Sequence, residues 1–245
     1  MKSIILHEGD CLKIMSEKIS DESIDMILAD LPYGITKNKW DIIIPFDKLW
    51  EQYHRIIKPN GAMVFTATQP FASQLVVSNL NYFRYDIIWE KPLSSGQMNI
   101  NNQPLRSHEL ILVFYKKLPT YNEQRTDGTP YEIYRTGKYK SGSYNPQTPS
   151  HKKNNGFRHA RSVIKISNPR IKGGHPTQKP IKLLEYLIKT YTNTEDIVLD
   201  NCMGTGSTGI ACQNLNRNFI GIELDKSYFQ KAKKEFNKKI NPFIE

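Results

Sequence analysis

The feature of this sequence that most limits its fold is a succession of short aliphatic and β-branched runs, separated by segments with helical spacing. Runs of this length suit buried strands, and their alternation with helices is typical of a doubly wound α/β fold. The 245 residues are enough to form one sizeable core. We therefore predict a mainly parallel, seven-stranded sheet with helices on both faces. The runs are residues 4–6, 24–29, 62–66, 87–89, 110–115, 197–199 and 219–222.

This alternation stops between residues 118 and 172, where basic and aromatic side chains are concentrated. The segment holds eleven Lys and Arg against three Asp and Glu, an excess that suits an anionic partner such as nucleic acid. A solvated loop is the alternative, but structureless loops of this length are uncommon in compact domains. We predict an inserted binding module. Its candidate contact residues are Arg125, Arg135, Lys138, Lys140, Lys152, Lys153, Arg158 and Arg161.

The overall composition narrows the class of protein. A formal net charge of +10 favours nucleic acid as the partner, although solubility alone would also account for it. Cys11, Cys202 and Cys212 form no CxxC pair, so we expect neither a disulfide framework nor a metal site. No apolar run approaches the length of a bilayer span, and we expect a cytoplasmic protein.

A glycine-rich loop follows the predicted strand that ends at Asp200. Gly204, Gly206 and Gly209 have G-x-G-x-x-G spacing and precede a helical segment, and Glu223 ends the next strand near the offset of a ribose-binding acid. A pyrophosphate at this loop would be repelled by the Asp200 carboxylate, whereas a sulfonium amino acid would be attracted. The loop therefore favours an adenosyl compound over a dinucleotide. Ser207, Thr208 and Leu224 are expected to line the same site.

The position of this loop late in the chain has a topological consequence. Too few residues follow Glu223 to complete a nucleotide-binding sheet, so the remaining strands must come from the N-terminal part. We expect a circularly permuted domain, in which the strand of residues 4–6 lies beside the Glu223 strand. Asp10 and Cys11 would then lie near the adenine of the ligand.

A second acid-tipped strand ends in Asp30, Leu31, Pro32 and Tyr33. Ligands of open α/β sheets bind outside the carboxyl ends of the strands, where this tetrapeptide and the glycine loop could meet. Together they resemble the amino-methyltransferases of DNA, whose catalytic motif has the form [DNS]-P-P-[YFW]. The sequence departs from that pattern at Leu31, and also at Asn201–Cys202, where the family more often has Pro-Phe.

The resemblance covers nearly the whole chain outside the insert. His175, Thr177 and Lys179 lie in a motif similar to the cofactor half of the permuted β-class enzymes. The segments 37–46, 89–91 and 107–109 are similar to small N6-adenine methylases of phages and mobile elements. The family resemblance implies a Rossmann-like methyltransferase fold with a catalytic half at 1–117, a target-recognition insert at 118–172 and a cofactor-binding half at 173–245. It adds Lys37, Lys39 and Trp40 to the candidate DNA contacts.

The resemblance also implies an activity, with S-adenosyl-L-methionine as cofactor and N6 of a flipped-out adenine in a specific DNA sequence as acceptor. The Asp30 carboxylate and the carbonyl of Leu31 or Pro32 would accept the amino N–H bonds, and Tyr33 would stack on the base. Asp30 would also adjoin the cofactor. Cytosine N4 as acceptor, a nucleotide-dependent oxidoreductase and a non-catalytic DNA-binding module are the alternatives. The sequence leaves open whether the protein forms a homodimer, and whether a cognate restriction endonuclease accompanies it or none does.

Overall fold

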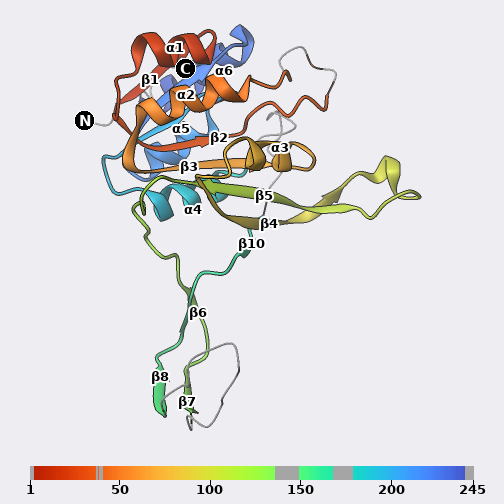
Figure 1. Cartoon of the computed structure of the whole chain (residues 1–245), viewed down its shortest axis with the longest axis vertical. Helices are drawn as coiled ribbons and strands as arrows, with labels where there is room; N and C mark the ends of the chain where they lie inside the picture. Colours follow the sequence, from red (N-terminus) through yellow and green to blue (C-terminus); the bar gives the residue numbers. More distant parts are fainter. Residues whose placement is uncertain (1–2, 37, 39–40, 136–148, 168–178, 241–245) are drawn as a thin grey trace. The chain divides into compact units, whose positions relative to one another are not determined.

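The computed structural model describes residues 3–36, 38, 41–135, 149–167 and 179–240. The chain divides into two compact units, and each has its own strands (Figure 1). The larger unit comprises Met1–Asn122 and Ser162–Glu245, and the smaller unit comprises Glu123–Arg161. In the described part of the chain, no helix is both long enough and apolar enough to cross a membrane.

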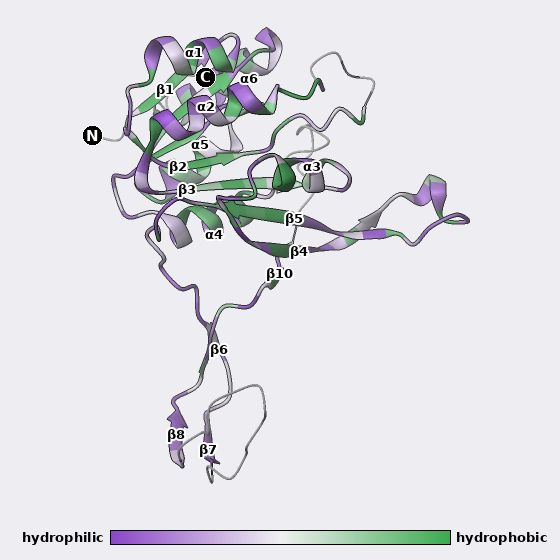
Figure 2. Cartoon of the chain, in the orientation of Figure 1, coloured by the Kyte–Doolittle hydropathy of each residue, from purple (hydrophilic) through white to green (hydrophobic). Residues whose placement is uncertain are grey.

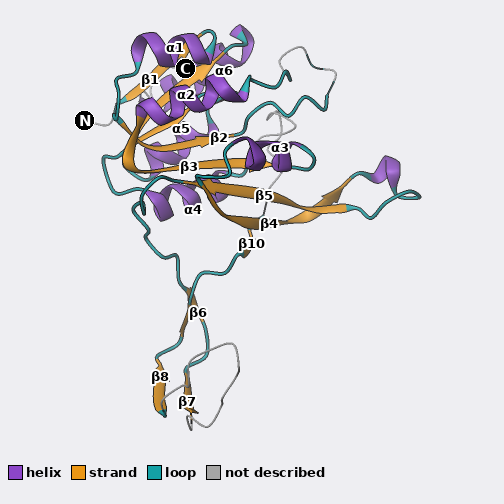
Figure 3. Cartoon of the chain, viewed as in Figure 1, coloured by secondary structure: helices purple, strands orange, loops and turns teal. Residues whose placement is uncertain are grey.

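The larger unit is built on one mainly parallel sheet, as predicted (Figure 3). It has eight strands instead of seven, because a short strand within the predicted insert, β10, pairs with β4. Only β5 runs against its neighbours. The expected pairing of the first strand with the Glu223 strand is confirmed. In spatial order the strands are β1 (Ile4–Glu8), β12 (Asn218–Glu223), β11 (Ile197–Asp200), β2 (Ile24–Ala29), β3 (Ile57–Ala67), β5 (Arg106–Phe114), β4 (Phe83–Ser95) and β10 (Val163–Lys165).

The central strands of this sheet are buried on both faces, which explains apolar runs such as Met26–Ala29 in β2 and Ala62–Phe65 in β3. In β2, Ile27 and Ala29 belong to one core cluster while Met26 and Leu28 belong to the other, because successive side chains point to opposite faces. Helices α1 (Cys11–Lys18), α2 (Phe46–Ile56) and α3 (Phe71–Ser78) contribute to the first cluster, and α4 (Ile181–Tyr191), α5 (Ser207–Asn214) and α6 (Lys226–Ile240) to the second. In Figure 2 the central strands are coloured mainly as hydrophobic, while α1 and α2 carry both hydrophobic and hydrophilic residues.

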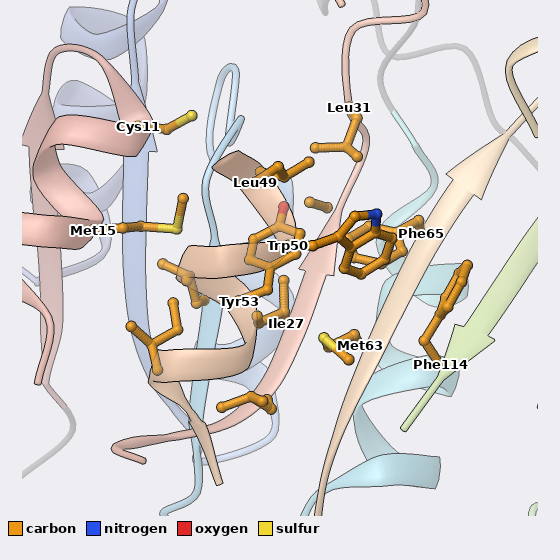
Figure 4. Packing of buried hydrophobic residues seen from close by; sticks show 14 of the residues in the cluster. Cys11, Met15, Ile27, Leu31, Leu49, Trp50, Tyr53, Met63, Phe65 and Phe114 are labelled. Atoms are coloured by element: carbon orange, nitrogen blue, oxygen red, sulfur yellow. The ribbon is translucent and has the colours of Figure 1, made fainter. Parts of the chain in front are cut away.

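Helix α2 illustrates how sequence pattern becomes packing. Leu49, Trp50, Tyr53 and Ile56 recur at helical spacing and are all buried. Figure 4 shows Trp50 and Tyr53 beside Phe65 on the adjacent strand, and the Tyr53 and Phe65 rings are stacked with centroids 5.5 Å apart. This packing holds the first layer of helices against β3.

The described residues of the smaller unit form two short antiparallel strand pairs. Strand β6 (Thr126–Asp127) pairs with β9 (Phe157–Arg158), and β7 (Tyr131–Arg135) pairs with β8 (Ser150–Asn154). Aromatic and guanidinium groups replace an aliphatic core here, since the Arg125 and Arg158 side chains lie over the rings of Phe157 and Tyr131. This unit, Glu123–Arg161, spans fewer residues than the predicted insert of residues 118–172.

Candidate active site

The two acid-tipped strands of the sequence are neighbours in the sheet. Strands β2 and β11 pair in parallel, with Met26 opposite Val198 and Ile27 opposite Leu199. Their carboxyl ends therefore lie at one edge, where Asp30 follows β2 and Asp200 ends β11. The expected convergence of the tetrapeptide and the glycine loop is confirmed.

The Asp30 carboxylate is held by three side chains. One oxygen, Oδ1, accepts hydrogen bonds from the Tyr33 hydroxyl at 2.5 Å and the Thr66 hydroxyl at 2.6 Å. The other, Oδ2, contacts the Lys179 ammonium at 2.7 Å. The Asp30 side chain remains about one-third exposed, at 34%. The carboxylate is thus fixed in orientation and still accessible to a further donor.

Lys179 connects Asp30 to a second carboxylate. Its ammonium lies 3.3 Å from Glu109 Oε2, and Lys91 lies 3.2 Å from Glu109 Oε1. Burial has the largest single effect and lowers the pKa of Lys179. Electrostatic interactions with Asp30, Tyr33 and Glu109, together with the hydrogen bond to Asp30, outweigh it, so the pKa is raised overall and the amine stays protonated. The sequence assigned Lys179 to the cofactor, whereas the structure places its charged group on Asp30.

The rest of the tetrapeptide lies in distinct environments. The Leu31 side chain is buried in the core, as Figure 4 shows, so the residue that departs from the family pattern presents only its backbone to the site. The Tyr33 ring packs against Phe71 with centroids 5.0 Å apart. Burial raises the pKa of Tyr33 well above its ordinary value, which keeps its hydroxyl a donor to Asp30.

The chain after the tetrapeptide is anchored by Asp41. Its carboxylate accepts hydrogen bonds from the backbone N–H groups of Gly34, Ile35 and Thr36 at 2.7–3.0 Å. These bonds lower the pKa of Asp41 against the opposing effect of burial, so the carboxylate stays ionised. Asp41 thereby shapes the loop that leaves the candidate site.

The three glycines of the loop have separate structural roles. Gly204 has φ of +55°, and a Cβ placed there would meet nothing within 4 Å, so this position is open toward a ligand. Gly206 has φ of +86° and precedes α5. A Cβ on Gly209 would come within 2.5 Å of the Phe236 ring and 2.6 Å of Phe219, so this glycine permits close helix packing.

Two buried carboxylates hold the glycine loop in place. Asp200 accepts hydrogen bonds from the Cys202 N–H at 3.0 Å and the Thr208 hydroxyl at 2.6 Å. Glu223 accepts one from the Gly204 N–H at 2.8 Å. Burial raises the pKa of Asp200 to about 7, and the charges of Asp30 and Glu223 act in the same direction. A cation bound here would relieve this accumulation of negative charge.

The turn after β1 adjoins this loop. The Gly9 N–H donates to the Glu223 carbonyl at 2.9 Å, which brings Asp10 and Cys11 to the expected edge of the sheet. The Asp10 carboxylate caps α1 by accepting from the Lys13 N–H at 2.9 Å. A hydrogen bond to Cys202 lowers the pKa of the Cys11 thiol.

Among the remaining cofactor candidates, Ser207 and Thr208 are buried at the start of α5 and Leu224 is exposed after β12. His175 and Thr177 lie outside the described residues.

Some of the candidate DNA contacts form interactions within the smaller unit, and others are exposed on it. Arg125 pairs with Glu123, and Arg158 donates to the Thr129 carbonyl at 2.6 Å, so both guanidinium groups hold the unit together. Lys153 lies 3.5 Å from Glu132. Lys152, Arg161 and Arg135 are exposed. Lys37, Lys39, Trp40, Lys138 and Lys140 lie outside the described residues.

The structure also reveals site residues to which the sequence assigned no role. Thr66 and Glu109 contact Asp30 and Lys179 from strands β3 and β5. Tyr53 donates a buried hydrogen bond to the Asn201 side chain at 2.7 Å and so joins α2 to the glycine loop. The segments containing Lys91 and Glu109 already formed part of the family resemblance, and this was the only signal for them.

Comparison with known proteins agrees with this geometry. A family model described as DNA methylase matches residues 24–234. The chain belongs to this DNA methylase family. It is 31% identical to the DNA adenine methyltransferase YhdJ of Escherichia coli over 92% of this chain and 80% of that protein. It is 28% identical to the type II methyltransferase M2.MboI of Moraxella bovis over 99% of this chain and 90% of that protein.

Two solved structures share the fold. The crystal structure of the M1.HpyAVI–SAM complex has a TM-score of 0.63 and 29% identity, covering 95% of this chain and 99% of that one. The cytosine-N4-specific PvuII DNA methyltransferase has a TM-score of 0.67 at 17% identity, covering 98% and 94%, which shows likeness of fold. Within the described residues, no group of His, Cys, Asp and Glu is arranged to hold a metal ion.

Proposed function

We propose that this DNA methylase transfers the methyl group of S-adenosyl-L-methionine to N6 of an adenine flipped out of a specific DNA sequence. The observation that carries the proposal is the shared sheet edge of the Asp30 carboxylate and the glycine loop. A donor ligand seated on that loop and a base seated against Asp30 would meet at the carboxyl ends of β11 and β2.

The glycine loop has the features that this cofactor requires. The space beside Gly204 is open, and the nearby carboxylates of Asp200 and Glu223 favour a cationic ligand over an anionic one. When bound, S-adenosyl-L-methionine supplies an electrophilic methyl group on a positively charged sulfur. Asp200 and Glu223 already accept backbone N–H groups of the loop, so we assign them first to its shape.

Asp30 provides the acceptor half of the chemistry. The lone pair of an exocyclic amine is delocalised into the ring, and a carboxylate that accepts an N–H bond favours the pyramidal, nucleophilic form. Such a bond to a charged group contributes about 1.5–3 kcal/mol. The Leu31 or Pro32 carbonyl would accept the second N–H, and the exposed part of the Asp30 carboxylate leaves room for the amine.

Lys179 is the positioning residue for this carboxylate. Its contact with Oδ2, together with the Tyr33 and Thr66 hydroxyls on Oδ1, restricts rotation of the Asp30 side chain. A side chain held in this way loses little orientational freedom when the amine binds. Tyr33 would then offer the exposed part of its ring to the base.

Adenine is favoured over cytosine by two observations. The family resemblance associates Asp at the first motif position with adenine and Ser with cytosine N4, and this chain has Asp30. YhdJ, a relative at 31% identity, is named a DNA adenine methyltransferase. The basic smaller unit, with exposed Lys152 and Arg161, is proposed as the target-recognition region.

The test uses purified protein, labelled cofactor and unmethylated DNA, with nucleosides of the hydrolysed product separated by mass spectrometry. We expect N6-methyladenine, a loss of about 10²–10⁴-fold in transfer for Asp30→Asn, and retained cofactor binding. Asp47→Asn, an exposed acid on α2, is the matched control. N4-methylcytosine would overturn the base assignment, and unchanged transfer by Asp30→Asn would overturn the catalytic one.

The two other functions considered from the sequence are weaker. An oxidoreductase was supported only by the glycine spacing, and membership of the DNA methylase family decides against it. A non-catalytic DNA-binding module would retain DNA without transferring a methyl group, which the same assay would reveal.

A further inference from the structure

Strands β4 and β5 extend past the rest of the sheet as a two-stranded arm. We define this β4–β5 arm as residues 91–108, and Figure 1 shows it projecting from the larger unit. Pairing between the strands shifts register after Glu90 and His108 and resumes at Ser95 and Arg106. A single helical turn, η1 (Gln97–Asn99), closes the end of the arm (Figure 3).

The arm leaves the sheet at the candidate catalytic edge. Strand β4 runs antiparallel to β5, and β5 runs antiparallel to β3, which is parallel to β2. The carboxyl ends of β4 and β2 therefore lie at the same edge. At the root of the arm, Lys91 contacts Glu109, and Glu109 contacts the lysine that holds Asp30.

The arm exposes several apolar side chains among polar ones. Met98 is fully exposed, and Ile100 and Leu93 are 59% and 63% exposed. Figure 2 shows hydrophobic and hydrophilic positions interspersed at the tip of the arm. The apolar side chains alternate with amides and so do not form the continuous patch expected of a homodimer interface. The amides are Gln97, Asn99, Asn101, Asn102 and Gln103.

The charge of the arm suits DNA. Residues 91–108 contain no Asp or Glu, while Lys91 and Arg106 are basic. Phosphates would therefore meet no repulsive carboxylate on this segment. Amide side chains hydrogen-bond the edges of bases, and a two-stranded β-ribbon is narrow enough to enter a groove.

We propose that the β4–β5 arm inserts Met98 and Ile100 into the DNA duplex beside the target base, while its amides bind the base edges that flipping exposes. This inference rests on the proposed function. Extruding a base breaks its stacking and leaves its partner base unpaired. In DNA-bending proteins, apolar Met, Ile and Leu side chains enter between base steps. Such a side chain would occupy the space that the extruded base leaves and would replace part of its lost stacking.

The test compares two DNA substrates that differ only in the cost of flipping. Both substrates carry the methylated site, which is first identified by sequencing DNA from cells that express the protein. In one substrate the target adenine is paired with thymine, and in the other it lies opposite an abasic position. The double variant Met98→Ser with Ile100→Ser is expected to lose roughly tenfold to hundredfold in kcat/KM on the paired duplex. On the abasic duplex we expect a change of less than about threefold, because little pairing remains to be broken.

The matched control is Val77→Ser with Leu80→Ser. These side chains are 75% and 64% exposed, and they lie at the end of α3 and in the turn before β4, away from the catalytic edge. The control should behave as the wild type on both substrates. Fluorescence of 2-aminopurine at the target position should rise with the wild type and the control, and stay low with the arm variant.

Two results would overturn the inference. They are wild-type kcat/KM of the arm variant on paired DNA, and equal losses on both substrates. Equal losses accompanied by a change from dimer to monomer in sedimentation would assign the arm to a second copy of the chain. Failure of the proposed function is distinguishable, since the wild type itself would then methylate neither substrate.

Discussion

Replacement of Lys179 by Met tests whether this lysine serves Asp30 or the cofactor. The substitution keeps an unbranched side chain but removes the ammonium that lies 2.7 Å from Asp30 Oδ2 and 3.3 Å from Glu109 Oε2. A hydrogen bond to a charged group contributes about 1.5–3 kcal/mol, and the partial exposure of Asp30 places the expected loss at the lower end. Without the ammonium, Oδ2 loses the contact that helps to fix the orientation of the Asp30 carboxylate.

This free energy sets the size of the effect on activity. At about 1.4 kcal/mol per tenfold change in rate, a loss of about 1.5 kcal/mol corresponds to a roughly tenfold lower kcat. Methyl transfer is measured with saturating cofactor, and cofactor affinity is measured by calorimetry. Lys182→Met, an exposed lysine on α4, is the control. An unchanged kcat together with lost cofactor affinity would refute the reasoning and restore the role that the sequence suggested.

Three further predictions concern the glycine loop and the smaller unit. Gly209→Ala should lower the free energy of unfolding by about 1–3 kcal/mol in urea titrations, because its Cβ would overlap the Phe236 ring. Gly204→Ala meets no neighbouring atom but strains the backbone at φ of +55°, at a cost of about 1–2 kcal/mol, and should also weaken cofactor binding in calorimetry. The pKa of Asp200 is raised to about 7, so the folded protein keeps this proton as pH rises from 4 to 7, whereas the unfolded chain loses it. The stability of the folded state should therefore fall over that range. Asp200→Asn should reduce this fall, as measured by thermal melts at each pH. Lys152→Ala should reduce the slope of log Kobs against log salt concentration for DNA binding by about one. Arg158→Ala should instead destabilise the smaller unit and increase its amide hydrogen exchange, because this side chain holds the unit together. A reduced salt slope for Arg158→Ala with unchanged hydrogen exchange would contradict this internal role.

The elements that position the site were predictable because their signals are local. A strand, a glycine loop and a helix follow one another within a few residues around Asp200, and β2 ends at Asp30. The pairing of β1 with β12 was predictable too, because the sheet needed a strand from the other end of the chain. The eighth strand was missed, since the three residues of β10 lie in a segment dominated by charge and aromatic rings.

The sequence by itself determined which side chains could do chemistry here and which strands would carry them, because periodicity, glycine spacing and strand-end acids are properties of neighbouring residues. Only the tertiary structure decided how the charges are used. Lys179 is 149 residues from Asp30 along the chain, yet it contacts that carboxylate, and Arg158 is occupied within its own unit. The partner of a charged group depends on which elements the fold brings together, and that position in space is not encoded in the local pattern around either residue.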